Sequence, residues 1–166
     1  MSKQVKGMLI GIGIIIFVII IDQITKGLAI SYLKEGNKSV KIIDGFFHLT
    51  YVENSGGAWG MFAGRMWGFI VVTLVALAIF AYLMKFFDLK ERTIFSIALI
   101  LMISGTLGNF IDRIFRGYVV DFLDFYIFGY NGYNFPVFNF ADICLTIGTS
   151  LLIFDILFGK SSHFLK

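Results

Sequence analysis

Charged residues, proline and cysteine are all scarce in this chain. Of its 166 residues only 15% are Asp, Glu, Lys or Arg, whereas a soluble domain carries roughly a quarter. There is one proline, and no Pro-, Ser- or Gly-rich run divides the chain, so we expect a single domain over residues 1–166. The only cysteine, Cys144, cannot form an internal disulfide, and its apolar surroundings favour a buried thiol over a nucleophile.

Several catalytic signatures are also missing. His48 and His163 match no zinc-ligand spacing, and there is no His-Glu-x-x-His, no Gly-x-Ser-x-Gly and no phosphate-binding glycine loop. The net charge of +3 is spread between apolar segments rather than gathered into a basic stripe, so no nucleic acid is expected as a partner. These absences disfavour a metalloprotease, a serine hydrolase and a nucleotide enzyme, and we expect neither a metal nor a cofactor.

Hydrophobic residues make up 58% of the chain and gather into four runs that are long enough to cross a membrane. The runs cover about residues 8–29, 67–87, 94–111 and 140–158. The first run follows two lysines, as the apolar part of a signal peptide does, but no small-x-small cleavage site comes after it. We therefore expect it to be retained, and the predicted fold class is all-α membrane, a bundle of four transmembrane helices.

The basic residues predict the orientation of the bundle. An even number of spans places both termini on one side, and the 14 Lys and Arg divide evenly between the two sides. Those on the side of the termini lie in short segments, whereas the others are spread over two longer connections, about 30–66 and 112–139. The density of positive charge favours cytoplasmic termini and extracytoplasmic connections.

The two long connections differ in composition and in the structure that they predict. In the first, Asp44-Gly45 separates two β-prone runs, 40–43 and 46–52, which is typical of a β-hairpin. The second is rich in Phe and Tyr, which suit the boundary between water and lipid. We expect both connections to lie on the membrane surface.

Polar residues that are costly inside a membrane gather at one depth of the predicted bundle. Asp22 lies about 21 Å beyond Met8, in a core of about 30 Å, and so falls in the outer half. Residues of the same outer level are Asp22, Lys26, Asn109, Asp112, Arg113, Asp121, Asn139 and Asp142. Because the acids outnumber the bases in this set, at least one carboxylate must be protonated, hydrogen-bonded or in contact with water.

Two neighbouring carboxyl groups can hydrolyse an amide without a metal. They cannot both ionise cheaply, so one retains a proton and binds the scissile carbonyl while the other activates water. A helix start would favour ionisation of Asp142, and apolar neighbours would keep Asp121 neutral. From the residues alone, a small transporter or proton conduit, or simple ion pairs with Lys26 or Arg113, would use the same carboxylates.

Five short motifs occur in order along the chain. They are Asp22-Gln23-Ile24-Thr25-Lys26, Asn54-Ser55-Gly56-Gly57-Ala58-Trp59, Gly108-Asn109-Phe110-Ile111-Asp112-Arg113, Val119-Val120-Asp121-Phe122 and Phe138-Asn139-Phe140-Ala141-Asp142. Together they resemble the bacterial lipoprotein signal peptidase family, signal peptidase II, from about Asp22 to Thr146. The sequence departs from the family pattern at Gly57, which replaces an alanine and makes that loop more flexible.

The resemblance implies an aspartic endopeptidase that removes signal peptides from diacylglyceryl-modified prolipoproteins within the membrane and cleaves just before the lipidated cysteine. The catalytic pair would be Asp121 and Asp142. The residues that support substrate binding or the site would be Asp22, Lys26, Asn54, Gly56, Asn109, Asp112, Arg113, Asn139 and Ala141.

The resemblance also carries expectations about fold, location and partners. It implies a small extracytoplasmic β-cradle and a surface loop or short helix on the four-helix bundle. The location would be the bacterial cytoplasmic (inner) membrane, with the active site on the extracytoplasmic side. Membrane lipids and globomycin-type inhibitors would bind, and a monomer is expected.

Two supporting roles stay open at this point. Asp22 and Lys26 are spaced for an i,i+4 ion pair, which favours an orienting role over a catalytic one. Arg113 would bind lipid phosphate or the substrate backbone, or else neutralise Asp112. A non-catalytic relative would keep the same fold and would tolerate Asp→Asn at either aspartate.

Overall fold

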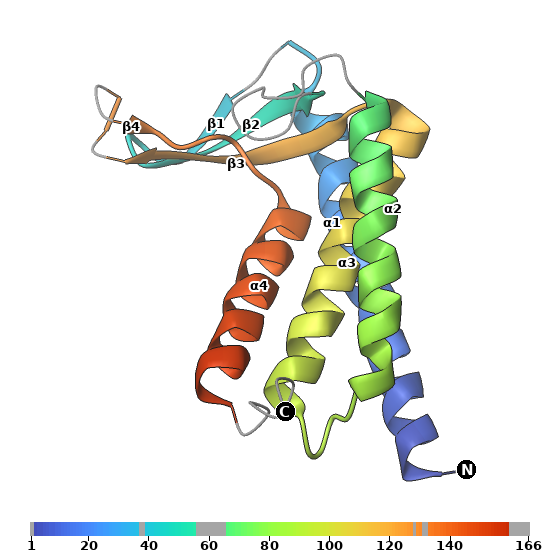
Figure 1. Ribbon diagram of the computed structural model, residues 1–166. Helices are drawn as coiled ribbons and strands as arrows, with labels where there is room; N and C mark the ends of the chain where they lie inside the picture. Colours follow the sequence, from blue (N-terminus) through green and yellow to red (C-terminus); the bar gives the residue numbers. More distant parts are fainter. Residues whose placement is uncertain (1, 37–38, 56–65, 128, 131–132, 160–166) are drawn as a thin grey trace.

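The computed structural model describes residues 2–36, 39–55, 66–127, 129–130 and 133–159. Among these residues, four helices are long and apolar enough to cross a membrane: Gln4–Leu33, Trp67–Phe86, Thr93–Arg116 and Phe140–Phe158. A small antiparallel sheet lies across one end of the helices (Figure 1). This architecture agrees with the predicted membrane bundle.

The helices are α1 (Lys3–Leu33), α2 (Met66–Leu83), α3 (Thr93–Arg116) and α4 (Phe140–Phe158), and a 3-10 turn, η2 (Met84–Phe86), follows α2. The strands are β1 (Ser39–Ile43), β2 (Phe47–Asn54), β3 (Val119–Ile127) and β4 (Tyr133–Asn134). The helix α3 continues beyond its predicted end at residue 111. Asp112, Arg113 and Arg116 therefore lie in its last turns rather than in the following connection.

The ends of two helices are defined by local sequence. Asn139 caps α4, because its side chain accepts a hydrogen bond from the Asp142 N–H while the Asp142 side chain accepts one from the Asn139 N–H. Gly117 follows α3 with a φ of 84°, a left-handed conformation that glycine adopts without strain. Both boundaries lie beside residues of the predicted site.

The strands pair in the order β1-β2-β3-β4. The predicted hairpin is confirmed: β1 and β2 are antiparallel around the turn at Asp44-Gly45. The second connection contributes β3, which pairs along β2 with Val52 opposite Asp121. Asp121 therefore lies on a strand, whereas the sequence had placed it in the loop before the fourth apolar run.

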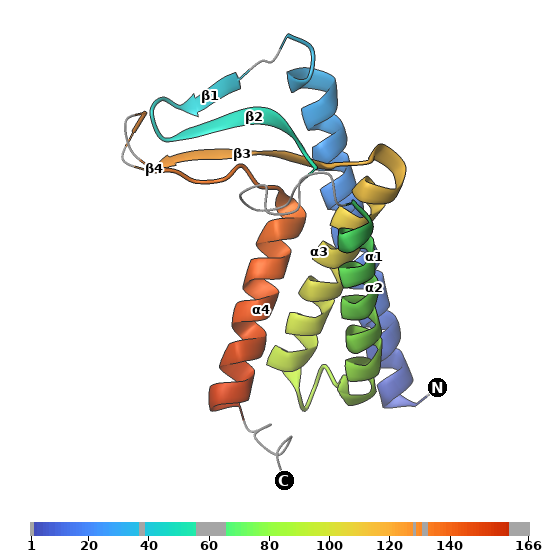
Figure 2. The ribbon, with the colours of Figure 1, turned by 45° about the horizontal axis from the view of Figure 1, so that its top comes forward.

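The expected surface helix remains a prediction. No such helix lies among the described residues of the two long connections, and residues 56–65 fall outside them. Figure 2 shows how the strands extend from the ends of α1 and α3 over the end of α4.

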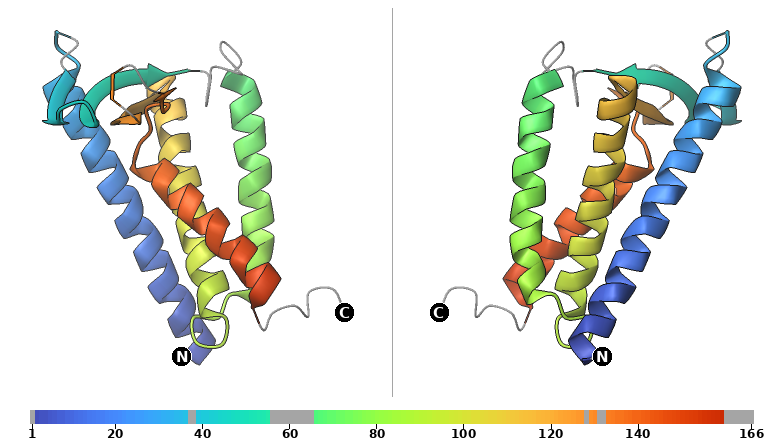
Figure 3. Two further views of the ribbon diagram at one scale, coloured as in Figure 1. Left: turned by 90° about the vertical axis from the view of Figure 1, so that its left-hand side faces the viewer. Right: turned by 90° about the vertical axis from the view of Figure 1, so that its right-hand side faces the viewer.

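Helix α3 is the centre of the bundle and contacts α1, α2 and α4. Its contact with α4 is close because glycines lie between the two helices: a Cβ atom at Gly105 would clash with the Ala141 carbonyl oxygen, and one at Gly148 would lie 3.0 Å from the Ala98 carbonyl oxygen. Figure 3 shows α4 crossing beside α3, with the start of α1 and the end of α4 at the side of the bundle opposite the sheet. The outer faces of α1 and α2 expose large apolar side chains, as lipid contact requires.

Candidate active site

Asp121 and Asp142 lie at the same end of the bundle although they come from different elements. Asp121 is on β3 and Asp142 is in the first turn of α4. Both line a cavity of about 680 Å³ that also involves residues of α2 and α3. The structure thus brings the two predicted catalytic residues to one cavity.

The Asp121 carboxylate is buried and accepts two short hydrogen bonds. Asn54 Nδ2 donates to its Oδ2 at 2.7 Å, and Asn139 Nδ2 donates to its Oδ1 at 2.6 Å. Burial raises the pKa of Asp121 to about 7, and the nearby charge of Asp142 adds to the rise. The two amide donors and Lys26 oppose this increase in pKa.

Asp142 is held by the same group of amides. Asn109 Nδ2 donates to its Oδ1 at 2.8 Å, and the Asn139 backbone N–H donates to its Oδ2 at 3.1 Å. Asn139 therefore bridges the two aspartates, with its side chain on Asp121 and its backbone on Asp142. Neighbouring carboxyl groups that share one proton can bind a carbonyl oxygen with one member and activate water with the other.

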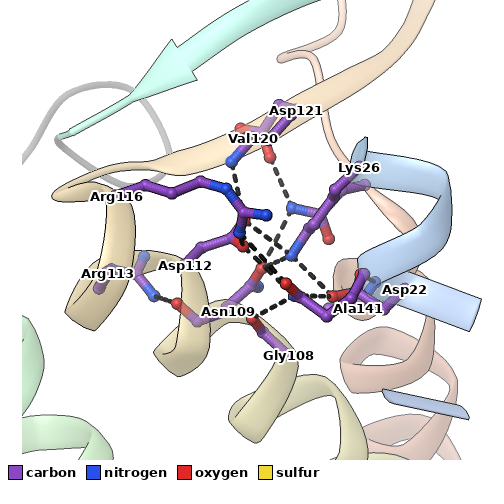
Figure 4. Close-up of polar contacts among 12 residues, drawn as sticks. Asp22, Lys26, Gly108, Asn109, Asp112, Arg113, Arg116, Val120, Asp121 and Ala141 are labelled. Atoms are coloured by element: carbon purple, nitrogen blue, oxygen red, sulfur yellow. Dashed lines mark hydrogen bonds and ion pairs between the residues drawn. The ribbon is translucent and has the colours of Figure 1, made fainter. Parts of the chain in front are cut away.

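A buried ionic cluster of Asp22, Lys26 and Asp112 lies beside Asp121 (Figure 4). Lys26 Nζ is 2.9 Å from Asp22 Oδ2 and 3.1 Å from Asp112 Oδ2, and it donates to Asn109 Oδ1 at 2.9 Å. The predicted i,i+4 ion pair of Asp22 and Lys26 is confirmed. Lys26 is fully buried, so each of its partners also offsets the cost of removing its charge from water.

The two acids of this cluster each hold a backbone N–H beside a candidate catalytic residue. Asp22 Oδ1 accepts the Ala141 N–H at 2.9 Å, and Asp112 Oδ2 accepts the Val120 N–H at 3.0 Å. Ala141 directly precedes Asp142, and Val120 directly precedes Asp121. The cluster therefore connects the backbone positions of both aspartates.

Comparison with known proteins decides the family. The family model for signal peptidase (SPase) II matches residues 14–158. The chain belongs to the signal peptidase II family. Membership makes it a protease and, with its four apolar helices, a multi-pass bacterial membrane protein.

Curated relatives of the signal peptidase II family support the assignment over most of the chain. The chain is 46% identical over 151 residues to the lipoprotein signal peptidase of Bacillus pumilus (strain SAFR-032), an alignment that covers 90% of this chain and 94% of the relative. It is 39% identical over 144 residues to the lipoprotein signal peptidase of Lactiplantibacillus plantarum (strain ATCC BAA-793 / NCIMB 8826 / WCFS1), with 87% and 91% covered.

Solved structures agree with this signal peptidase II assignment. One bacterial membrane enzyme, determined by the in meso method at 2.3 Å resolution, is 40% identical with a TM-score of 0.77 and covers 89% of this chain and 87% of its own. A second, at 1.9 Å, is 40% identical with a TM-score of 0.75 and covers 89% and 92%.

In this member of the signal peptidase II family, Arg113 lies at the cavity and not in the buried ionic cluster. It lines the cavity, donates from Nη1 to the Asn109 carbonyl oxygen at 3.3 Å, and lies 4.4 Å from the centre of the Phe69 ring. Asp112 forms its ion pairs with Lys26 and Arg116 instead. The position of Arg113 therefore suits contact with a bound molecule better than neutralisation of Asp112.

Two residues of the site were missed by the sequence prediction. Arg116 forms an ion pair with Asp112, and Gln23 donates to Asp112 Oδ1 at 3.2 Å. The i,i+4 spacing of Asp112 and Arg116 would have indicated the first contact if α3 had been expected to continue past residue 111. Gly56, the remaining supporting residue of the prediction, lies outside the described residues.

Proposed function

We propose that this chain is an aspartic endopeptidase that removes signal peptides from diacylglyceryl-modified prolipoproteins, with Asp121 and Asp142 as its catalytic pair. The observation that carries the proposal is that both carboxyl groups line one cavity and are bridged by Asn139. The substrate class comes from the relatives, which are named lipoprotein signal peptidases. Cleavage would fall just before the lipidated cysteine.

The proposed reaction uses the two aspartates in different protonation states. The raised pKa of Asp121, about 7, makes it the partner that holds the proton at neutral pH and binds the scissile carbonyl oxygen. Asp142, whose charged form is stabilised by its amide donors, takes a proton from water as the water attacks the carbonyl carbon. The leaving amine then receives a proton from the pair, and no covalent intermediate forms.

The cavity suits a substrate that remains partly in lipid. Its wall includes apolar side chains from α2 and α4, such as Val72 and Ile147, beside the polar end that holds the aspartates. Apolar walls would accommodate the signal peptide while Arg113 binds the substrate backbone or a lipid phosphate. A globomycin-type peptide that fills the same cavity would block the reaction.

The polar end of the bundle would face the extracytoplasmic side. Both termini would then be cytoplasmic, which agrees with the dense Lys and Arg residues near the chain ends and the α2–α3 connection. We further propose that the protein acts as a monomer, because one chain is sufficient to supply both aspartates and the Asn54, Asn109 and Asn139 donors that bind them. A small transporter or proton conduit with the same carboxylates is the alternative, and it would place acids through the depth of the membrane. Within the described membrane-spanning helices, Asp155 is the one acid that lies away from the polar end.

The substrate proposal is tested by comparing two forms of one prolipoprotein. Purified protein in liposomes is given the diacylglyceryl-modified form or the unmodified form, and the products are identified by mass spectrometry. We expect cleavage of the modified form alone, at the bond before the lipidated cysteine. Equal cleavage of both forms, or cleavage at another bond, would remove the proposed substrate class, and ion flux without cleavage would support the transporter.

A further inference from the structure

Arg116 lies in the last turn of α3, directly before the turn that leads into β3. Its Nη1 donates to Asp112 Oδ1 and to Gln23 Oε1, the latter at 3.1 Å (Figure 4). The Arg116 side chain is 26% exposed, whereas that of Asp112 is fully buried. The guanidinium group therefore covers the outer side of a buried carboxylate.

The two oxygens of Asp112 have separate partners. Oδ2 accepts the Val120 N–H at 3.0 Å and lies 3.1 Å from Lys26 Nζ. Oδ1 is bound by Arg116 and by Gln23 Nε2. Because a carboxylate can rotate about its last side-chain bond, the groups on Oδ1 act together with Lys26 on Oδ2 to keep Oδ2 facing the Val120 N–H.

Arg116 also balances the charge of the cluster. Asp22 and Asp112 provide two negative charges, and Lys26 and Arg116 provide two positive charges. Without Arg116, the cluster would carry one uncompensated negative charge next to the aspartates of the cavity. Such a charge is costly when buried and disfavours ionisation of neighbouring carboxyl groups.

We propose that Arg116 is a positioning residue for the peptidase reaction, which holds Asp112 in the orientation that fixes the backbone before Asp121. The inference rests on the proposed function. Arg116 acts through Asp112 and Gln23, whereas Arg113 is the arginine that lines the cavity. The two arginines of α3 thus have different roles: Arg113 faces the cavity where substrate would bind, and Arg116 supports the buried cluster.

The pH dependence of cleavage separates this role from a merely structural one. The charged groups that surround the contact are Asp112 and Arg113 on α3, Asp22 and Lys26 on α1, Asp121 on β3 and Asp142 on α4. Loss of the positive charge of Arg116 makes the potential at both catalytic carboxyl groups more negative. Both limbs of the pH–rate profile should then move to higher pH, which a general loss of stability would not cause.

The experiment measures kcat and KM against pH for the wild type, Arg116→Gln, Arg116→Lys and Lys41→Gln. The control, Lys41, forms an exposed ion pair with Asp44 on the sheet, away from the cluster. We expect Arg116→Gln to lower kcat about tenfold with a small change in KM. Both limbs of its pH–rate profile should move to higher pH by about half a pH unit. Arg116→Lys should lower kcat but leave the limbs in place, and Lys41→Gln should match the wild type.

Each outcome bears on the inference. The inference would be overturned if Arg116→Gln had the kcat and the pH–rate profile of the wild type. It would also be overturned if kcat fell equally at every pH, with both limbs of the profile at their wild-type positions. If Arg116→Gln does not fold, Arg116→Lys decides. A lower kcat with unmoved limbs and a wild-type melting temperature supports the role, whereas wild-type kinetics, or a kcat that falls only together with the melting temperature, overturn it. A wild-type protein that cleaves nothing would remove the proposed function itself, whereas cleavage unaffected at residue 116 would remove only this inference.

Discussion

The Asp121 carboxyl group is the residue-scale feature that should govern how activity depends on pH. Its pKa is raised to about 7 by burial and by the charge of Asp142, while the amide of Asn54 lowers it. In the proposed reaction Asp121 must be protonated when substrate binds. Activity should therefore be lost as pH rises through about 7, because that is where Asp121 ionises.

Substitution of one hydrogen-bond donor tests this assignment. Asn54→Ala removes a donor that stabilises the charged form, so the pKa of Asp121 should rise and the basic limb of kcat/KM should move to higher pH. Thr50→Ala is the matched control, because Thr50 donates in the same way to Asp124 on the same strand. A basic limb that stays in place in Asn54→Ala would contradict the role of Asp121 as the proton holder.

At this scale the sequence could identify the polar residues but not their partners. The scarcity of charge in an apolar chain singled out the group of polar residues to which Asp121 and Asp142 belong. The resemblance to signal peptidase II then selected these two as the catalytic pair. The contacts of Asn54 and Asn139 depend on how β2 and β3 align and on where α4 begins, which no local pattern reveals. Arg116 was missed for a related reason. It lies one turn after Asp112 only because α3 continues to residue 116, five residues beyond its predicted end.

At the scale of elements, α3 packs extensively and closely against α4. A Cβ atom at Gly105 would clash with the Ala141 carbonyl oxygen and lie 2.8 Å from Leu145 Cγ. Ala141 precedes Asp142, so the position of one candidate catalytic residue depends on this contact. The glycine is therefore required for the site as well as for packing.

Gly105→Ala should consequently move the start of α4 and lower cleavage by about tenfold or more, together with the melting temperature in detergent. Gly68→Ala on α2 is the control, since among the described residues no atom beyond the adjoining helix backbone lies within 4 Å of a Cβ at that position. We expect Gly68→Ala to retain full activity. Similar rates for the two variants would show that close packing of α3 and α4 does not position Asp142.

The elements differ in how well the sequence predicts them. Apolar length predicted the four helices, and Asp44-Gly45 predicted the hairpin of β1 and β2, because both signals are local. The strand β3 was not predicted, since its partner β2 lies far away in the sequence and its Phe and Tyr residues suggested a surface loop. A register irregularity between Leu49 and Val52 further hides the alternation of the strands.

At the scale of the whole molecule, the structure separates a polar end from an apolar body. The sheet lies at one end of the bundle, and the start of α1 and the end of α4 lie at the other (Figure 3). The two aspartates and the ionic cluster lie at the same end as the sheet. The density of Lys and Arg predicts that the chain ends are cytoplasmic. The candidate active site would then open on the extracytoplasmic side.

Cysteine labelling measures this orientation. Glu35 follows α1 at the polar end, Glu91 lies between α2 and α3 at the opposite end, and both are exposed, whereas the native Cys144 is buried. A membrane-impermeant maleimide should label Glu35→Cys in intact cells and Glu91→Cys only after the membrane is opened. The reverse pattern would place the cavity on the cytoplasmic side and contradict the orientation.

The central claim, that Asp121 and Asp142 form the catalytic pair, is tested most directly by cleavage of a diacylglyceryl-modified prolipoprotein by purified Asp121→Asn, Asp142→Asn and Asp124→Asn. Asp124 is the matched control, a buried acid on the same strand that binds Thr50. We predict that the first two variants lose at least about a hundredfold in rate, that Asp124→Asn keeps the wild-type rate, and that a metal chelator has no effect on the wild type. A wild-type rate in either Asp121→Asn or Asp142→Asn would contradict the account.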